Sequence, residues 1–376
     1  MQVAILHASA GAGHQKAAES IHEALKASGV SESNLLLRDA LDDTPPWFKK
    51  IYTSVYFNSV KYTPGLWGAS YDLAEHPFVY RNLIKPVRTI LNSGVGRSLA
   101  ERMKNENPKV ILFTHFLAPE LLGRLKTRGE ISSHLISVVT DFVPHAFWIN
   151  PGTDHYWVMS EEGKEILEKQ GVPPSKITAG GIPIAACFKP QGKKKEVRRK
   201  EGLSEDRFTV LLTSGSFGLG PTVDVLEALA SFGERIQAIV VSGLNKDLLR
   251  TLEAKQFPFR TKLYGFVSHM DELMEASDLI IAKPGGITTS ESLAKGVPMV
   301  VMDPIPGQEM GNARILKERN AAFFLGKPAD IQVIVKGILD YPEVLAEKKH
   351  EIERLAKPNS SADLASFVLN QIKIKK

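Results

Sequence analysis

The stretch that most constrains the fold of this chain lies at residues 278–296, where an apolar run, a glycine turn and a helix-like segment follow one another. The apolar run at 278–282 predicts a buried parallel strand. Gly285 and Gly286 end this strand, and residues 287–295 have the composition of a helix that ends at Gly296. A glycine turn before a helix leaves N–H groups without partners at the positive end of the helix dipole. The sequence therefore predicts a phosphate-binding turn here.

Polar side chains surround this turn. Thr288, Thr289 and Ser290 add hydroxyl donors, and the adjacent Glu291 is an acceptor suited to a ribose diol. The next predicted strand, at 298–302, is followed by Gln308 and Glu309, which would bring an amide and a carboxylate to the same edge of the sheet. The two glycines by themselves would also be explained by a turn that binds no ligand, as in any α/β enzyme. The polar residues at this spacing favour a binding site.

The wording of residues 283–312 resembles the nucleotide-sugar site of the glycosyltransferases of family 28. It is most similar to the diacylglycerol glucosyltransferases of Gram-positive bacteria and the plant monogalactosyldiacylglycerol synthases. In those enzymes a Lys-Pro-Gly-Gly-like turn, a Thr/Ser-Glu pair and a Pro-Gly-Gln-Glu loop bind the uridine diphosphate (UDP) sugar. The resemblance implies donor contacts at the matching residues here: Gly285, Gly286, Thr288, Thr289, Glu291, Gln308 and Glu309.

Length and composition are those of a globular protein with two domains. The 376 residues suit two domains of about 150–200 residues each, and the chain has no apolar run of about 18 residues that would span a bilayer. The N-terminus reads as a first strand, so no signal peptide is expected. A single cysteine, Cys187, excludes an internal disulfide and a cysteine-based zinc site. A cytoplasmic protein is expected. The formal net charge of +5 suits nucleic acid, an anionic membrane face, or neither.

Strand-like and helix-like segments alternate along the chain, which predicts an α/β fold with two parallel sheets. The first set of strands is expected at 3–6, 35–39, 110–114, 135–140, 155–159 and 177–179, and the second at 209–213, 238–242, 262–265, 279–282, 298–302 and 322–325. Between them, residues 189–200 are rich in lysine and arginine and read as a solvated linker. A nucleic-acid-binding patch is the alternative for this linker, but no nucleic acid is expected as a partner.

This organisation describes the GT-B architecture, in which two Rossmann-like domains with parallel sheets face a central cleft. We expect a first domain at residues 1–190, which binds acceptor and membrane, and a nucleotide-sugar-binding domain at residues 191–376. The resemblance also implies that the last helix, at about 362–376, returns to the first domain.

An insertion at about residues 45–104 is rich in aromatic side chains. Residues 47–80 hold 10 of the 29 aromatic residues of the chain, among them Trp47, Phe48 and Trp67. Basic residues flank or interleave them, including Lys49, Lys50, Lys61, Arg81, Lys85, Arg88 and Arg97. Aromatic rings among basic residues suit the headgroup layer of an anionic membrane. The alternative is that the rings pack beneath a long helical insertion, and both can hold at once.

A second glycine loop follows the first predicted strand and contains Gly11, Gly13 and His14. Two glycines after a strand also occur in NAD-binding proteins, where Asp39 would hold the ribose, but the third glycine of that motif is missing. In the resembling lipid glycosyltransferases a glycine loop ends in a histidine that faces the acceptor hydroxyl. The resemblance therefore implies that His14 takes a proton from the acceptor near Gly13. A histidine that caps the helix or bonds a loop carbonyl is the alternative.

Further acceptor-side candidates follow the predicted strand at 135–140. The resembling enzymes carry a Thr-Asp-Phe segment, a histidine and a tryptophan here, which match Asp141, His145 and Trp148. Asp141 would act as the base or orient His14, although an aspartate that closes the loop fits as well. His115, after the strand at 110–114, is a weaker candidate.

Two loops of the second half complete the predicted donor site. The small residues at 213–220, including Gly215 and Ser216, let the backbone approach a ligand and resemble a diphosphate-contacting turn. By resemblance to the cell-wall glucosaminyltransferase, Phe266 and Val267 would cover the uracil. Core packing explains both residues equally well.

The sequence lacks an Asp-x-Asp motif in a suitable loop, so no metal site and no cofactor beyond the donor are expected. The resemblance implies an inverting, metal-independent transfer of a hexose from a UDP-sugar to diacylglycerol or a similar lipid. The partners would then be the UDP-sugar, the lipid and an anionic membrane surface, with the protein on the inner face of the cell membrane. Alternatives are a UDP-N-acetylglucosamine transferase acting on a lipid-linked acceptor and a non-catalytic UDP-sugar sensor.

Overall fold

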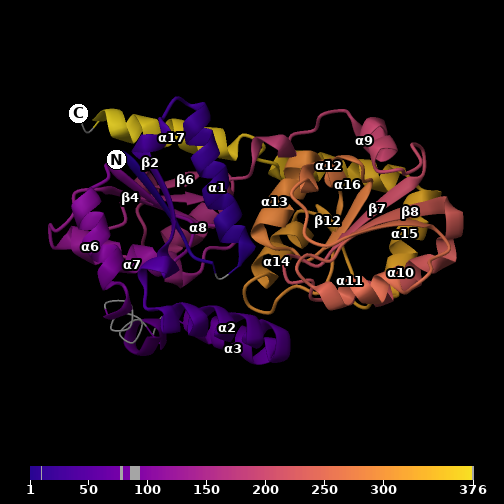
Figure 1. Cartoon of the computed structure of the whole chain (residues 1–376), viewed down its shortest axis with the longest axis horizontal. Coiled ribbons are helices and arrows are strands. Elements are labelled where there is room, and N and C mark those ends of the chain that lie inside the picture. Colours follow the sequence, from indigo (N-terminus) through magenta and orange to yellow (C-terminus); the bar gives the residue numbers. More distant parts are fainter. Residues whose placement is uncertain (10, 77–78, 85–93, 375–376) are drawn as a thin grey trace. The chain divides into compact units, whose positions relative to one another are not determined.

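The computed structural model describes residues 1–374 except residues 10, 77–78 and 85–93. Lys85 and Arg88, named above, lie outside the described residues, as does Phe78, one of the aromatic residues of 47–80. The chain divides into two compact units. Unit 1 consists of Met1–Ala186, Pro306–Gly311 and Asn359–Lys376, and unit 2 of Cys187–Ile305 and Asn312–Pro358. Figure 1 shows the elements of each unit.

Unit 1 is built on a six-stranded parallel sheet in the order β2-β1-β3-β4-β5-β6. The strands are β1 (Val3–His7), β2 (Leu35–Asp39), β3 (Val110–Phe113), β4 (His134–Val138), β5 (His155–Val158) and β6 (Ile177–Ala179). The helices are α1 (Ala12–Ala27), α2 (Pro46–Tyr62), α3 (Pro64–Glu75), α6 (Arg97–Glu106), α7 (Leu117–Thr127), α8 (Glu161–Lys169) and α17 (Ser360–Ile374). The order reverses between β1 and β3, and ligands of open α/β sheets bind outside the carboxyl ends of the strands at such a reversal.

Helices cover both faces of this sheet because alternate residues of a strand point to opposite sides. On one face Val3 and Ile5 pack with residues of α1 and α17, such as Ile21 and Leu364. On the other face Ala4 and Leu6 of the same strand pack with residues of α6 and α7. Helices α1 and α17 lie side by side (Figure 1). The last helix therefore belongs to unit 1.

Unit 2 carries a second six-stranded parallel sheet, in the order β12-β11-β10-β7-β8-β9. The strands are β7 (Phe208–Thr213), β8 (Ile236–Val241), β9 (Arg260–Tyr264), β10 (Leu279–Ala282), β11 (Met299–Val301) and β12 (Ala322–Phe324). The helices are α9 (Lys194–Lys200), α10 (Thr222–Leu229), α11 (Lys246–Glu253), α12 (Met270–Glu275), α13 (Gly286–Lys295), α14 (Met310–Glu318), α15 (Asp330–Asp340) and α16 (Glu343–Leu355). This is the strand order of a dinucleotide-binding fold, with its reversal between β7 and β10.

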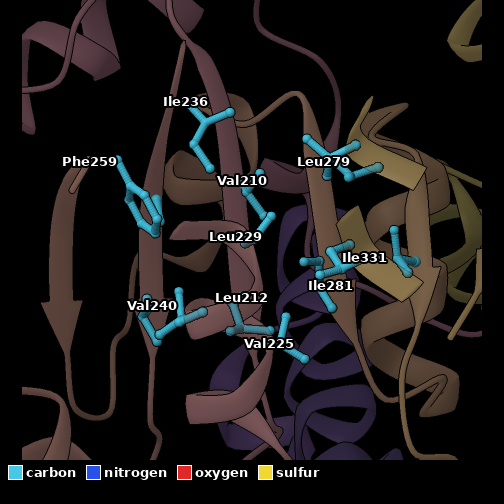
Figure 2. Close-up of a cluster of buried hydrophobic side chains, with 14 of the residues drawn as sticks. Val210, Leu212, Val225, Leu229, Ile236, Val240, Phe259, Leu279, Ile281 and Ile331 are labelled. Carbon is cyan, nitrogen blue, oxygen red and sulfur yellow. The ribbon is translucent and has the colours of Figure 1, made fainter. Parts of the chain in front are cut away.

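The core of unit 2 forms where strand side chains meet the covering helices. Figure 2 shows Val210, Leu212, Leu279 and Ile281 of the central strands together with Val225 and Leu229 of α10 and Ile331 of α15. Aliphatic residues dominate these strands because both faces of a parallel sheet are buried. The predicted fold class, two Rossmann-like domains with parallel sheets, is confirmed.

Two boundaries differ from the sequence-based expectation. The first unit ends at Ala186, close to the expected residue 190, but Pro306–Gly311 also belongs to unit 1. The Pro-Gly-Gln-Glu loop was therefore wrongly placed in the second domain. Glycines allow this packing: a Cβ added to Gly68 of α3 would lie 2.6 Å from Pro306, and one added to Gly307 would lie 2.8 Å from Tyr71.

The basic segment at 189–200 is not simply a solvated linker. Residues 194–200 form helix α9, and the Arg198 side chain in it is only 4% exposed. Its guanidinium donates to the carbonyls of Ala276 and Glu205 and to Asp278 Oδ2, at 2.8, 2.6 and 2.6 Å. The pattern of charges predicted a solvated segment, but one arginine of the run is buried and forms hydrogen bonds that link segments of unit 2.

The insertion between β2 and β3 contains α2, α3, a π-helical turn at Tyr80–Ile84, and α6. Helices α2 and α3 run alongside each other (Figure 1). Helix α2 contains no buried residue over its 17 residues, although it carries Trp47, Ile51, Val55 and Tyr62. Across the described residues, no helix is both long and apolar enough to cross a bilayer.

Replacing Leu364 tests whether α17 is an integral part of unit 1. Leu364 is fully buried against the sheet, so Leu364→Ala should lower the free energy of unfolding of unit 1 by about 2–5 kcal/mol. Calorimetry should show the melting transition of unit 1 shift to lower temperature. Ser366→Ala, on the exposed side of the same helix, is the control and should leave that transition in place. Equal melting of both variants would contradict this packing.

Candidate active site

His14 lies in the first turn of α1, at the strand reversal of unit 1. Its Nδ1 is 2.7 Å from the carbonyl oxygen of Thr114, which follows β3, and 3.0 Å from Thr140 Oγ1, which follows β4. The Thr114 hydroxyl in turn donates to the His14 carbonyl at 2.8 Å. Segments that follow three strands therefore fix one imidazole. Gly13 precedes His14 in the same turn.

The hydrogen bond to Thr114 determines the tautomer of His14. A carbonyl oxygen can only accept, so Nδ1 carries the proton and Nε2 carries the lone pair. Burial lowers the pKa of His14 to about 4. The ring is therefore neutral at pH 7, with one nitrogen able to accept a proton. The alternative reading of His14, that it bonds a loop carbonyl, is also true, and this bond is what orients the ring.

A cavity of about 350 Å³ within unit 1 adjoins His14. Its walls are mainly aromatic and aliphatic, and four polar residues interrupt them. The lining residues are His14, Phe48, Ile51, Tyr52, Val55, Tyr56, Trp67, Tyr71, His115, Phe116, Leu117, Asp141, Phe147 and Gln308. The rings of α2 that face the cavity recur every four residues, at Phe48, Tyr52 and Tyr56, as one helix face requires. The cavity thus combines an apolar body with a polar group able to accept a proton.

Asp141 lines the same cavity and is 8% exposed. Burial, with a smaller contribution from the negative charge of Glu309, raises the pKa of Asp141 to about 7. Its carboxyl group is therefore about half protonated at neutral pH. Asp141 and His14 both remain candidates for the base.

Tyr56 of α2 connects the insertion to the loop at Pro306–Gly311. The Tyr56 hydroxyl donates to Gln308 Oε1 at 3.2 Å, and its ring meets Trp67 edge-on at 5.5 Å. Desolvation of the half-buried Tyr56 hydroxyl, with smaller contributions from Glu309 and Asp141, raises the pKa of Tyr56 well above its usual range, so the hydroxyl stays protonated. Gln308 and Glu309, predicted for the donor side, thus lie in unit 1, where Gln308 lines the cavity.

Five other acceptor or membrane candidates divide into two groups. Phe48 and Trp67 line the cavity, and Trp47 is 58% exposed. Trp148, in contrast, is 1% exposed and packs in the core with Val139 and Tyr156, so it is not a surface residue. His145 is also buried at 1%, where its Nδ1 accepts from the Phe147 N–H at 3.1 Å. His145 therefore supports the cavity wall from behind.

In unit 2 the two glycine loops follow the adjacent strands β7 and β10, on either side of the strand reversal. Gly285 caps α13 in an extended conformation without a side-chain hydrogen bond, and the first intrahelical bond runs from the Thr289 N–H to the Gly285 carbonyl. The N–H groups of Gly286, Ile287 and Thr288 precede that bond, as the phosphate-binding prediction requires. Thr288 is half-buried, and Glu291 is 9% exposed one turn on.

Thr289 does not fit the predicted donor set. It is 1% exposed and faces a small space lined by Leu293, Met299 and Ile352. Its hydroxyl has no hydrogen-bond partner among the described residues. Because residues on a helix turn by about 100° each, Thr289 points inward where Thr288 does not.

The loop after β7 is held open by glycines. Gly215, Gly218 and Gly220 have φ of 68°, 58° and 133°, which favours glycine. The Leu244 N–H donates to the Ser216 carbonyl at 2.8 Å, and Asn245 Nδ2 donates to the Gly218 carbonyl at 3.0 Å. A neighbouring loop that the sequence did not single out thus fixes the predicted diphosphate turn.

Phe266 follows β9 and is 57% exposed, so core packing does not explain it. Val267 beside it is half-buried. An exposed ring at the carboxyl edge of a sheet is suited to cover a planar base.

Sequence reasoning gave no individual role to two side chains, the Tyr56 hydroxyl and the Lys283 ammonium, although both lie in segments that it singled out. The four-residue spacing of the α2 rings was a signal for Tyr56, but the pairing with Gln308 joins residues far apart in the chain. Lys283 Nζ bonds Asp303, which no local pattern predicts. In the described part of the chain, no group of three histidine, cysteine, aspartate or glutamate residues is placed to hold a metal ion.

Comparison with known proteins connects both units to one family. Residues 14–184 match the model of monogalactosyldiacylglycerol synthase, and residues 209–364 match the glycosyltransferase family 28 C-terminal domain. The chain is a glycosyltransferase of family 28. Its relatives include proteins named processive diacylglycerol beta-glucosyltransferase. That of Bacillus pumilus is 28% identical over 98% of this chain and 95% of the relative. That of Staphylococcus saprophyticus is 28% identical over 98% of this chain and 92% of the relative.

Solved structures show the same GT-B fold as this glycosyltransferase. MurG of Acinetobacter baumannii is 14% identical, with a TM-score of 0.59 over 98% of this chain and 99% of that chain. UDP-GlcNAc 2-epimerase of Neisseria meningitidis, bound to UDP-GlcNAc, is 14% identical, with a TM-score of 0.63 over 98% and 100%. HepE of Anabaena, in complex with UDP-glucose, is 13% identical, with a TM-score of 0.57 over 98% and 99%.

Asp141→Asn should stabilise the glycosyltransferase at high pH. Because the folded-state pKa of Asp141 is raised to about 7, the folded protein binds this proton more tightly than the unfolded chain does. Stability from this group is present at low pH and is lost as pH rises from about 4 to 7. The variant should exceed the wild type by up to about 4 kcal/mol at pH 8, with the difference shrinking toward pH 4. Urea unfolding at several pH values measures this, and a pH-independent difference would contradict it.

Proposed function

We propose that this glycosyltransferase moves a hexose from a UDP-sugar to the hydroxyl of diacylglycerol or a related membrane lipid, forming a glycolipid. The cavity of unit 1 carries the proposal, because its walls suit an apolar molecule and a neutral histidine adjoins them. The match of residues 14–184 to monogalactosyldiacylglycerol synthase and the names of the relatives support the same acceptor. The UDP-containing structures with the same fold support the donor.

The acceptor hydroxyl would lose its proton in the cavity. As its oxygen bonds the anomeric carbon, the proton passes to His14 Nε2, or to Asp141 in its ionised form. The bond between the anomeric carbon and the diphosphate breaks, and its electron pair stays on the diphosphate oxygen. A single displacement of this kind inverts the configuration at the anomeric carbon. General-base assistance of this type contributes about 10²- to 10⁴-fold to the rate.

The donor would bind at the strand reversal of unit 2. The N-terminus of α13 and the glycine loop after β7 are suited to the diphosphate, Glu291 to a diol, and Phe266 to the uracil. Donors that the chain itself supplies stabilise a leaving diphosphate without a metal ion, so we propose a metal-independent transfer.

The lipid would enter from a membrane surface on which α2 and α3 rest. Ile51 and Val55 line the cavity and are also 53% and 55% exposed, so the apolar wall continues onto the outside of α2. Trp47 of α2 and Leu66 of α3 add apolar surface, at 58% and 73% exposure. Lys50 and Lys61 of α2 are also exposed and suit anionic headgroups. We place the protein peripherally on the inner, cytoplasmic face of the membrane.

His14→Gln should abolish most of the transfer while leaving donor binding intact. The amide cannot take the proton, so kcat should fall by about 10²- to 10⁴-fold. Steady-state rates of UDP release measure kcat, and calorimetric titration with UDP measures binding. His350→Gln, an exposed histidine of α16, is the matched control and should retain full activity. A His14→Gln variant with unchanged kcat would rule out His14 as the base.

Removing exposed apolar side chains that do not line the cavity should weaken membrane binding. Trp47→Ser combined with Leu66→Ser should lower the affinity for anionic vesicles at least about tenfold, because each side chain contributes about 1.5–3 kcal/mol when fully buried. Vesicle co-sedimentation measures this. Val333→Ser combined with Tyr341→Ser, at 75% and 62% exposure in unit 2, is the control. If the affinity of the wild-type protein for vesicles depended on neither the lipid charge nor the salt concentration, the proposed docking surface would be wrong.

The function itself is tested by incubating the pure protein with anionic vesicles containing diacylglycerol and a panel of UDP-sugars, with chelator present. Mass spectrometry should detect a new glycolipid with at least one donor, together with released UDP. Donor binding without any product would indicate a sensor. A product formed only on a lipid-linked cell-wall acceptor would indicate an N-acetylglucosamine transferase.

A further inference from the structure

We propose that Lys283 binds the diphosphate of the sugar donor and neutralises the charge that this leaving group gains during transfer. Asp303 would hold the lysine in place. The proposal rests on the proposed function, since it assumes that the donor is a nucleoside diphosphate sugar. It adds a charged side chain to the groups that the sequence suggested for the diphosphate, which were backbone N–H groups and hydroxyls.

Lys283 stands between the two glycine loops of unit 2. It is the first residue after β10, two positions before the cap of α13. A Cβ added to Gly220, in the loop after the adjacent strand β7, would lie 3.7 Å from Lys283 Cε. The stem of the lysine therefore runs within van der Waals reach of one glycine loop while its backbone begins the other.

The ammonium group is held by a residue in an unusual conformation. Lys283 Nζ donates to the Asp303 carbonyl at 2.7 Å and to Asp303 Oδ2 at 2.5 Å. Asp303 follows β11 and has a φ of 45°, a left-handed conformation that costs a non-glycine residue about 1 kcal/mol or more. In this conformation both its main-chain and side-chain oxygens reach the same lysine.

The charges of the pair are unequally shielded. The Lys283 side chain is 13% exposed and that of Asp303 is 52% exposed, so water screens the carboxylate much more than the ammonium. Asp303 takes two of the three N–H groups of the ammonium, and no described residue takes the third. With the cap of α13 two residues away, the remaining ammonium N–H and the helix N-terminus offer hydrogen-bond donors to an anion at this point of the sheet edge.

A cation here would favour the transition state over the bound donor. As the bond between the anomeric carbon and the diphosphate oxygen breaks, the electron pair remains on that oxygen and the diphosphate gains negative charge. An interaction that strengthens during this step raises kcat, whereas one of constant strength only tightens binding. We therefore expect Lys283 to act on both the UDP affinity and kcat.

The test compares UDP with uridine as ligands of the full-length protein by calorimetric titration. Lys283→Met should weaken UDP binding by about 10- to 100-fold, the usual consequence of losing a charge-assisted hydrogen bond, and leave uridine binding unchanged. It should also lower kcat with the UDP-sugar. Lys336→Met removes the same charge from an exposed lysine of α15 and is the matched control, with no expected effect.

The outcomes separate this inference from the proposed function. Failure of the wild-type protein to bind UDP would overturn the proposed function. Wild-type binding that Lys283→Met leaves unchanged would overturn the role of Lys283 alone. An equal loss of uridine and UDP binding would do the same, because it would indicate a damaged loop. If Lys283→Met lowers the melting temperature of unit 2, Lys283→Gln keeps a bond to Asp303 and carries the same expectation.

Discussion

The hydrogen bond between His14 Nδ1 and the Thr114 carbonyl is the constraint on which the acceptor side of this protein depends. It fixes the tautomer, so that one nitrogen carries a lone pair, and burial keeps the ring neutral at pH 7. The bond exists because β1 and β3 are neighbours at the strand reversal, where the segments that follow them meet. The topology of the sheet thus orients this imidazole, which we propose as the base, before any substrate is present.

The insertion gives this imidazole a specific environment. One face of α2 supplies the rings of the cavity, and the exposed part of the same helix carries apolar and basic side chains. The loop at Pro306–Gly311 completes the cavity with Gln308, bonded to Tyr56. A helix without a buried residue is poorly explained by core packing alone. Contact of α2 with a membrane surface, as we propose, would account for its exposed apolar side chains.

The sequence predicted the strands well, because parallel strands buried on both faces read as continuous aliphatic runs. It also placed His14, Asp141 and the turn at Gly285 at the carboxyl ends of strands, where ligands of open α/β sheets bind. It was wrong where the answer depended on the direction of a side chain. Thr289 points inward beside the half-buried Thr288, Trp148 belongs to the core, and Arg198 is a buried tie in a charged run. The bonds of Lys283 to Asp303 and of Tyr56 to Gln308 each join segments that are distant in the sequence. The first also depends on the left-handed backbone of Asp303. Local sequence patterns predict neither feature.

The central claim is that the cavity beside His14 receives a lipid acceptor. Photolabelling tests it most directly, with a diacylglycerol that carries a photoreactive group on one acyl chain, presented in anionic vesicles. The account predicts adducts on peptides of α2 and α3, at residues 46–75, that excess unlabelled diacylglycerol removes. Adducts confined to unit 2, or adducts in unit 1 that unlabelled lipid does not displace, would contradict it.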